Sequence, residues 1–153
     1  QGVFFETEER YMKVRDVMTG RVISVSPQEN AAVAARLLSR YNIGALPVCT
    51  KEGKLRGVVT DRDIVLRCVA ADDDPRQTKV SDLMTRRIVS IGAEESADAA
   101  AALMAREQIR RLPVEQDGKL VGIVSLADLA RRADYSAQTA QTLGEISSNA
   151  NFR

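Results

Sequence analysis

The stretch Gly57–Ile64, GVVTDRDI, is an apolar run that ends in a threonine, two aspartates and an arginine. The same pattern returns at Gly122–Leu129, GIVSLADL. In each stretch a hydroxyl residue is followed three positions later by an aspartate. At the change from strand to helix, this spacing is typical of a capping box, in which both side chains satisfy free backbone N–H groups. The sequence therefore predicts two equivalent strand-to-helix junctions, formed by Thr60 with Asp63 and by Ser125 with Asp128.

The rest of the chain is duplicated as well. VRDVMTGRVISV, from Val14, matches VSDLMTRRIVSI, from Val80, and YNIGALPV matches EQIRRLPV at the same offset of 66 residues. Self-similarity of this kind indicates two copies of one supersecondary unit, neither of which buries its apolar face alone. We divide the chain into an N-terminal extension (1–13), repeat 1 (14–69), a linker (70–79), repeat 2 (80–133) and a C-terminal tail (134–153). Met12 is a candidate native start, which would make part of residues 1–11 a vector-derived remnant.

Each copy is predicted to run strand, helix, strand, turn, strand, helix, which gives an α+β fold. In the first copy, VISV (22–25) is a short strand, and the SPQE that follows offers Ser26 as N-cap, Pro27 at the first helical position and Glu29 to complete a capping box. The next apolar residues recur every three or four positions, as in a helix that covers a sheet. ALPVC and LRGVV are predicted strands, as are LPV and LVGIV, which are joined by an Asp117-Gly118 turn. The tail has an apolar stripe that predicts either a short helix or a frayed end, formed by Ala137, Ala140, Leu143 and Ile146.

Composition argues against several classes of function. The net charge is +1 and aromatic residues make up 4% of the chain, so no basic surface for nucleic acid or anionic membrane is indicated. No apolar stretch approaches the ~18 residues of a membrane span, and the acidic start does not resemble a signal peptide, which favours a cytoplasmic protein. Cys49 and Cys68 lack metal-ligand spacing and are interpreted as reduced core thiols. The chain has no histidine, nucleophile elbow, P-loop or metal-ligand cluster, so we predict no enzyme activity, no catalytic cofactor and no metal site.

The two junctions allow a second interpretation. A helix N-terminus gathers free N–H donors and partial positive charge, and a carboxylate at its rim can accept both hydroxyls of a ribose. Two such charge-assisted hydrogen bonds contribute about 1.5–3 kcal/mol each, against about 1 kcal/mol for a cap. The residues alone leave capping and ligand binding open.

In both copies, three segments in the same order resemble the cystathionine β-synthase (CBS) domain family: DVMTGRVISV with DLMTRRIVSI, IGALPV with IRRLPV, and GVVTDRD with GIVSLAD. The resemblance covers about residues 14–132. It implies a CBS-domain pair, with two βαββα repeats related by a pseudo-twofold axis and their sheets packed face to face. It also implies clefts for adenosine-containing ligands such as AMP, ADP, ATP, NAD or S-adenosylmethionine.

The resemblance further implies that each cleft takes its ribose grip from one copy and its base pocket from the other. The first cleft would then combine Thr60 and Asp63 with Ile88, Val89, Arg110, Arg111, Leu112 and Pro113. The second would combine Ser125 and Asp128 with Val22, Ile23, Gly44, Ala45, Leu46 and Pro47. Because guanidinium groups bind phosphate in bidentate fashion, we predict that phosphate-bearing nucleotides prefer the first cleft.

The expected function is a regulatory sensor that changes conformation or dimer arrangement when an adenosine nucleotide binds, and that acts on an unidentified effector protein. The alternative is a structural dimerisation module in which the two motifs are helix caps only. In both cases we expect a homodimer that binds neither nucleic acid nor membrane.

Overall fold

A computed structural model describes residues 12–131 and residue 144 of the chain. Its described residues fall into two compact units. Unit 1 contains residues 12–22, 89–117 and 121–131, and unit 2 contains residues 23–88 and 118–120. The C-terminal apolar stripe and the N-terminal extension up to residue 11 lie outside the described residues.

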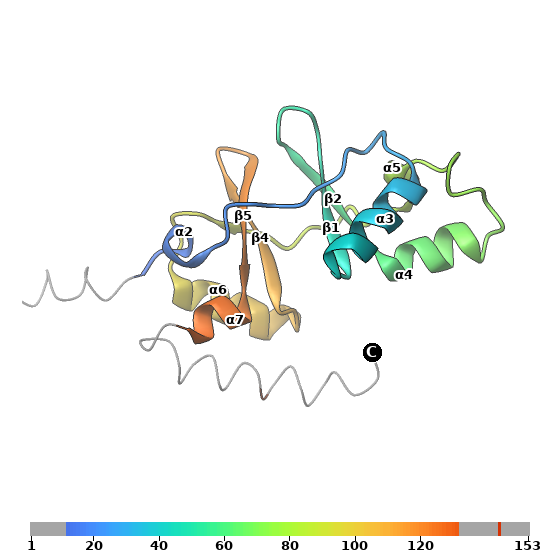
Figure 1. Ribbon diagram of the computed structural model, residues 1–153. Helices are drawn as coiled ribbons and strands as arrows, with labels where there is room; N and C mark the ends of the chain where they lie inside the picture. Colours follow the sequence, from blue (N-terminus) through green and yellow to red (C-terminus); the bar gives the residue numbers. More distant parts are fainter. Residues whose placement is uncertain (1–11, 132–143, 145–153) are drawn as a thin grey trace, which may run out of the picture. The chain divides into compact units, whose positions relative to one another are not determined.

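Unit 2 is built around the hairpin of β1 (Ala45–Cys49) and β2 (Leu55–Thr60), which pair antiparallel. Its helices are α3 (Ala31–Tyr41), α4 (Asp61–Ile64), the π-helix η1 (Val65–Val69) that continues α4, and α5 (Val80–Leu83) (Figure 1). One face of α3 packs on the hairpin, because its inward positions are small or apolar. The core of the unit includes Ala34, Leu38, Leu46, Val48, Val59 and Cys68.

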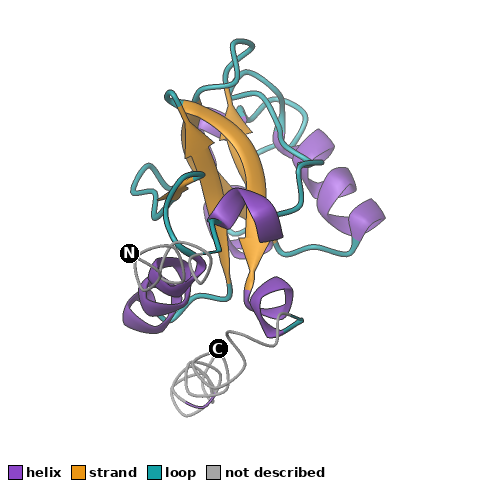
Figure 2. Cartoon of the chain, turned by 90° about the vertical axis from the view of Figure 1, so that its left-hand side faces the viewer, coloured by secondary structure: helices purple, strands orange, loops and turns teal. Residues whose placement is uncertain are grey.

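Unit 1 has the same plan with one more strand. Its sheet has the order β3 (Ile91–Gly92), β4 (Arg111–Gln116), β5 (Lys119–Ser125), with β3 parallel to β4. Its helices are α2 (Val14–Val17), α6 (Ala97–Glu107) and α7 (Leu126–Ala130), and Figure 2 shows helices in purple beside the strands in orange. Asp117 and Gly118 both have positive φ, 54° and 76°, so the predicted hairpin turn is confirmed. Helices mixed with small sheets confirm the α+β class.

The amino-terminal segment of each copy packs with the other copy. In unit 1, the N–H of Val14 donates to Glu95 O at 2.8 Å, and the N–H of Ala97 donates to Met12 O at 2.7 Å. In unit 2, the positions 66 residues away make the same two bonds: Val80 N to Glu29 O at 2.8 Å, and Ala31 N to Thr78 O at 2.8 Å. We call residues 12–22 and 78–88 the exchanged segments. Each compact unit therefore contains parts of both sequence repeats.

Each exchanged segment then joins the outer edge of a hairpin. Thr19 N donates to Ile123 O at 2.8 Å, and Ile123 N donates back to Thr19 O at 3.0 Å. Thr85 and Val58 make the equivalent two bonds in unit 2, at 2.9 and 3.0 Å. The open edges of β5 and β2 are covered at these points, which satisfies backbone groups that an edge strand leaves unpaired.

Charged side chains also hold the first exchanged segment. Glu94 accepts hydrogen bonds from Lys13 Nζ at 2.7 Å and from Arg15 Nη1 at 2.9 Å. The hydrogen bond from Lys13, assisted by the charge of Arg15, lowers the pKa of Glu94 below its usual value. Because these side chains are about half exposed, water screens the ion pairs and their contribution to stability is small.

Two sequence expectations in the first copy were wrong. Helix α3 begins at Ala31 with Asn30 as its N-cap, and the Asn30 side chain accepts from Val33 N at 3.0 Å. Ser26 instead accepts from Gln28 N within a turn, four residues before the N-cap Asn30. The predicted strand 22–25 is reduced to a single parallel bridge between Val25 and Val48.

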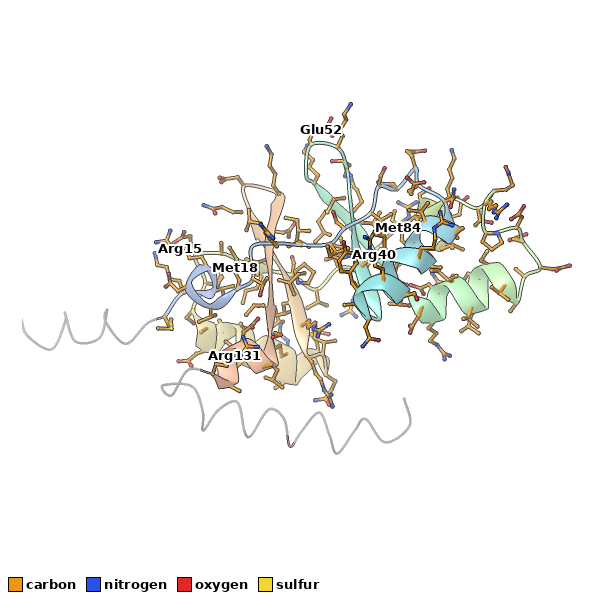
Figure 3. All side chains as sticks on the ribbon, viewed as in Figure 1. Arg15, Met18, Arg40, Glu52, Met84 and Arg131 are labelled. Carbon is orange, nitrogen blue, oxygen red and sulfur yellow. The ribbon has the colours of Figure 1, made fainter. Side chains whose placement is uncertain are left out.

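Gly57 and Gly122 lie where the exchanged segments cross the strands. A Cβ atom at Gly57 would lie 2.7 Å from Thr85 O and 2.9 Å from Met84 Sδ. At Gly122 it would lie 2.9 Å from Thr19 O and 2.5 Å from Met18 Sδ. Figure 3 labels the two methionines. A side chain at either glycine would push the exchanged segment off its strand.

We therefore expect Gly57→Ala and Gly122→Ala each to lower the free energy of unfolding by about 1–3 kcal/mol, the usual range for overpacking. Urea denaturation followed by circular dichroism measures this change. Gly20→Ala is the control, since a Cβ there meets nothing within 4 Å. If all three variants were as stable as the unmodified protein, the close approach of the exchanged segments to these glycines would not contribute to stability.

Candidate functional site

The two predicted junctions are both capping boxes. Thr60 Oγ1 accepts from Asp63 N at 3.0 Å, and Asp63 Oδ2 accepts from Thr60 N at 2.9 Å. Ser125 and Asp128 repeat the pair at 3.0 and 2.9 Å. The capping interpretation is thus confirmed in both copies, and one oxygen of each carboxylate is committed to the backbone.

The second oxygen of each carboxylate faces an arginine. Asp63 Oδ1 lies 3.8 Å from Arg67 Nη1, and Asp128 Oδ1 accepts from Arg131 Nη1 at 3.3 Å. Figure 3 labels Arg131. The aspartate side chains are 13% and 10% exposed, whereas the arginines are more than half exposed. The second oxygen of each aspartate therefore lies beside a solvent-exposed arginine, although the aspartate side chain itself is mostly buried.

In unit 2, three stretches of chain meet at the first junction. Ala45 is the pairing partner of Thr60, and Asp61 N donates to Gly44 O at 3.1 Å. The exchanged segment pairs through Thr85 with Val58, two residues before Thr60. Of the first predicted set, unit 2 contains Thr60, Asp63 and Ile88, and unit 1 contains Val89, Arg110, Arg111, Leu112 and Pro113.

The second junction, in unit 1, is built the same way. Leu126 N, at the first position of α7, donates to Arg110 O at 2.8 Å, and Thr19 pairs with Ile123. The backbone of Arg110 thus lies at the junction of its own copy, and the side chains of Arg110 and Arg111 are exposed. Of the second predicted set, unit 1 contains Ser125, Asp128 and Val22, and unit 2 contains Ile23, Gly44, Ala45, Leu46 and Pro47.

The MT pair of each copy thus pairs with a strand of the other copy, while the strands that carry Pro47 and Pro113 stay with their own copy. Leu46 and Leu112 are fully buried and belong to the two cores. The pairing of each ribose grip with the other copy's proline strand stays a prediction of the family resemblance.

Sequence reasoning missed Arg67 and Arg131. Arg67 stands four residues after Asp63, a spacing that places oppositely charged side chains on one helix face. The spacing could therefore have indicated the contact between Arg67 and Asp63 from the sequence. For Arg131 the spacing is three, and the position equivalent to Arg67 is 132, which lies outside the described residues.

Within residues 12–131, no three histidine, cysteine, aspartate or glutamate side chains come together as a set that could hold a metal ion. In the same part of the chain, no helix has the length and apolar character needed to cross a membrane. Cys49 and Cys68 are both buried.

Comparison with known families gives two matches to the CBS domain model, at residues 14–69 and 80–135. The chain belongs to the CBS domain family. A CBS domain-containing protein of Bacillus subtilis, YhcV, is 45% identical over 131 residues, which are 84% of this chain and 92% of that protein. Hypoxic response protein 1 of Mycobacterium tuberculosis is 38% identical over 76% of this chain and 82% of its own length.

Solved structures of CBS-domain pairs have the same fold. A crystal structure of Hypoxic Response Protein I with two coordinated zinc ions matches with a TM-score of 0.71 and 38% identity, over 78% of this chain and 98% of that chain. The CBS domain pair of protein MJ0100, in complex with 5′-methylthioadenosine and S-adenosyl-L-methionine, matches with a TM-score of 0.65 and 29% identity. That match covers 79% of this chain and 94% of the other.

The caps make a prediction about stability. We expect Thr60→Ala and Ser125→Ala each to lower the free energy of unfolding by about 1 kcal/mol, because an N–H of the first helical turn loses its acceptor. Denaturant titration measures the change. Thr50→Ala, in the β1–β2 turn, is a control that removes a hydroxyl acceptor away from any helix. Unchanged stability in both cap variants would contradict a structural role for the boxes.

Proposed function

We propose that this CBS-domain pair is an adenosine-nucleotide-binding regulatory module with its ribose grips at Asp63 and Asp128. The observation that carries the proposal is the state of the two carboxylates. One oxygen of each accepts the cap hydrogen bond, and the other lies beside a solvent-exposed arginine. A carboxylate fixed in this way needs little reordering to accept ribose hydroxyls, and preorganisation of this kind favours binding.

The surroundings of both carboxylates support the same conclusion. Backbone from the other copy pairs with the strand two residues before each junction, so the proposed ligand at Asp63 or Asp128 would lie close to both repeats. A ligand that favours one arrangement of the repeats shifts the population toward it. The bound adenosine compounds of MJ0100, a structure 29% identical to this chain, agree with the proposed ligand class.

The module as proposed acts by binding, without turnover, in the cytoplasm, and reports ligand occupancy to an effector protein. Its sequence offers no nucleophile or general-base motif, and a sensor needs neither. Occupancy controls the output only to the extent that the ligand binds one arrangement more tightly than another.

Calorimetric titration of AMP, ATP, NAD and S-adenosylmethionine into the protein tests the proposal. Asp63→Asn keeps an oxygen for the Thr60 cap but removes the charge, so we expect near-normal folding and an affinity at that site lower by about tenfold or more, equivalent to 1.4 kcal/mol. Asp128→Asn makes the same test at the second junction. A stronger loss of phosphate-bearing ligands in Asp63→Asn than in Asp128→Asn would agree with the predicted preference of the first cleft.

Glu52→Gln is the matched control, because this carboxylate is exposed at the tip of the β1–β2 hairpin (Figure 3). It should bind like the unmodified protein. If no adenosine compound binds the folded protein after co-purified ligand is removed, the two motifs are caps only and the proposal is wrong.

A separate observation favours the proposal that the protein forms a homodimer. Of the four large apolar side chains that are exposed in the described part of the chain, three lie on η1: Val65, Leu66 and Val69, which are 54%, 50% and 59% exposed. We call these three residues the η1 patch. Contiguous exposed apolar side chains are typical of interaction surfaces, and self-association of one patch gives a twofold contact.

Leu66→Glu places a charge in the η1 patch and should weaken the dimer by about tenfold or more, because a charge buried in an apolar interface is unpaired. Sedimentation equilibrium measures the dissociation constant. Lys51→Glu, at the exposed hairpin tip, adds negative charge outside the patch and should leave association unchanged. A monomeric unmodified protein, or a dimer insensitive to Leu66→Glu, would rule out this interface.

A further inference from the structure

Arg67 contacts a backbone carbonyl as well as the carboxylate of Asp63. Its Nη1 donates to Leu83 O at 2.8 Å and lies 3.8 Å from Asp63 Oδ1. Leu83 is the last residue of α5, so its carbonyl is one of those that a helix leaves without an intrahelical partner. A cationic side chain at this end of a helix satisfies the carbonyl and complements the helix dipole.

Leu83 lies directly before the part of the exchanged segment that covers β2. Met84 follows it and packs over Gly57, and Thr85 then makes its two hydrogen bonds to Val58. One guanidinium group is therefore shared between the proposed ribose grip of the first copy and the exchanged segment of the second. All of these residues belong to unit 2.

We propose that Arg67 is a positioning residue that couples occupancy of Asp63 to the docking of residues 83–88 on β2. Because its Nη1 is hydrogen-bonded to Leu83 O, Arg67 holds its positive charge 3.8 Å from the outer oxygen of Asp63 and favours one orientation of that carboxylate, the one proposed to accept a ribose hydroxyl. By thermodynamic reciprocity, a ligand that binds this orientation stabilises the docked segment to the same extent. The proposal rests on the proposed function for its ligand, although the coupling between Asp63 and the segment exists without one.

Arg131 offers a natural comparison. It donates to Asp128 Oδ1 at 3.3 Å, as Arg67 approaches Asp63. Among the described residues, however, its hydrogen bonds do not include a carbonyl of the exchanged segment 12–22. Substituting Arg131 thus perturbs the Asp128 carboxylate without removing a hydrogen bond to an exchanged segment.

The first experiment is hydrogen exchange of the Thr85 amide with and without saturating adenosine, the moiety common to the candidate ligands. In the unmodified protein we expect adenosine to raise the protection of this amide by about threefold to tenfold, since a hydrogen bond from a half-exposed charged donor is modest. Arg67→Met should abolish the rise and weaken adenosine binding by a similar factor, and Arg67→Lys should restore part of both. Arg131→Met should leave the response of Thr85 unchanged.

The second experiment needs no ligand. As a single substitution, Asp63→Asn should lower the protection of the Thr85 amide. In a protein that already carries Arg67→Met, adding Asp63→Asn should lower it no further, because two residues that act through one contact have non-additive effects. Amides of α3, in the core of the same unit, report the stability of unit 2. A uniform loss of protection that includes α3 would mean that Arg67 is merely structural and would overturn the proposal.

The two experiments fail in different ways. If adenosine does not bind the unmodified protein, the proposed function is wrong and the ligand-free comparison alone decides the coupling. If adenosine binds and the response of Thr85 survives in Arg67→Met, the proposed function stands and Arg67 has no positioning role. Equal effects of Asp63→Asn in both backgrounds would likewise overturn the coupling.

Discussion

The structure depends on a reciprocal set of backbone hydrogen bonds between the two repeats. Val14 with Glu95 and Val80 with Glu29 are the same bond made twice, and so are Thr19 with Ile123 and Thr85 with Val58. Each bond contributes only about 1 kcal/mol net, yet an unsatisfied buried partner would cost more than the bond gains. The need to keep these hydrogen bonds explains why glycine lies where each segment crosses a strand, since there is no room for a Cβ at Gly57 or Gly122.

The same side chains serve the fold and the proposed chemistry. Asp63 and Asp128 fix the first turns of α4 and α7 through one oxygen, and the other, which we propose as the ligand acceptor, lies beside an arginine. A carboxylate in free solution would have to lose rotational freedom before it could bind. Here the cap has already restricted the side chain, so the structural and functional interpretations of the motif support each other.

Much of this arrangement was readable from the sequence. The repeat, the hairpins, the Asp117-Gly118 turn and both capping boxes follow from local rules, because turns and caps depend on residues close together in the chain. The exchange of segments could not be read from periodicity, since it depends on which copy each segment meets. The N-cap Asn30 of α3 was missed because Ser26 offered an equally good local signal. Arg67 was missed because its bond to Leu83 joins residues that only the fold brings together.

The exchange also bears on how such a chain can arise. In a single repeat folded by itself, the outer edge of the second hairpin strand would be unpaired. Its amino-terminal segment would have no strand to pack against. Two separate copies that exchange this segment would satisfy both, and such an assembly is a domain-swapped dimer. Joining them in one chain makes the swap intramolecular and independent of concentration. The two halves of such a chain can then differ in sequence, as they do here where one has Arg110 and Arg111 and the other has Gly44 and Ala45.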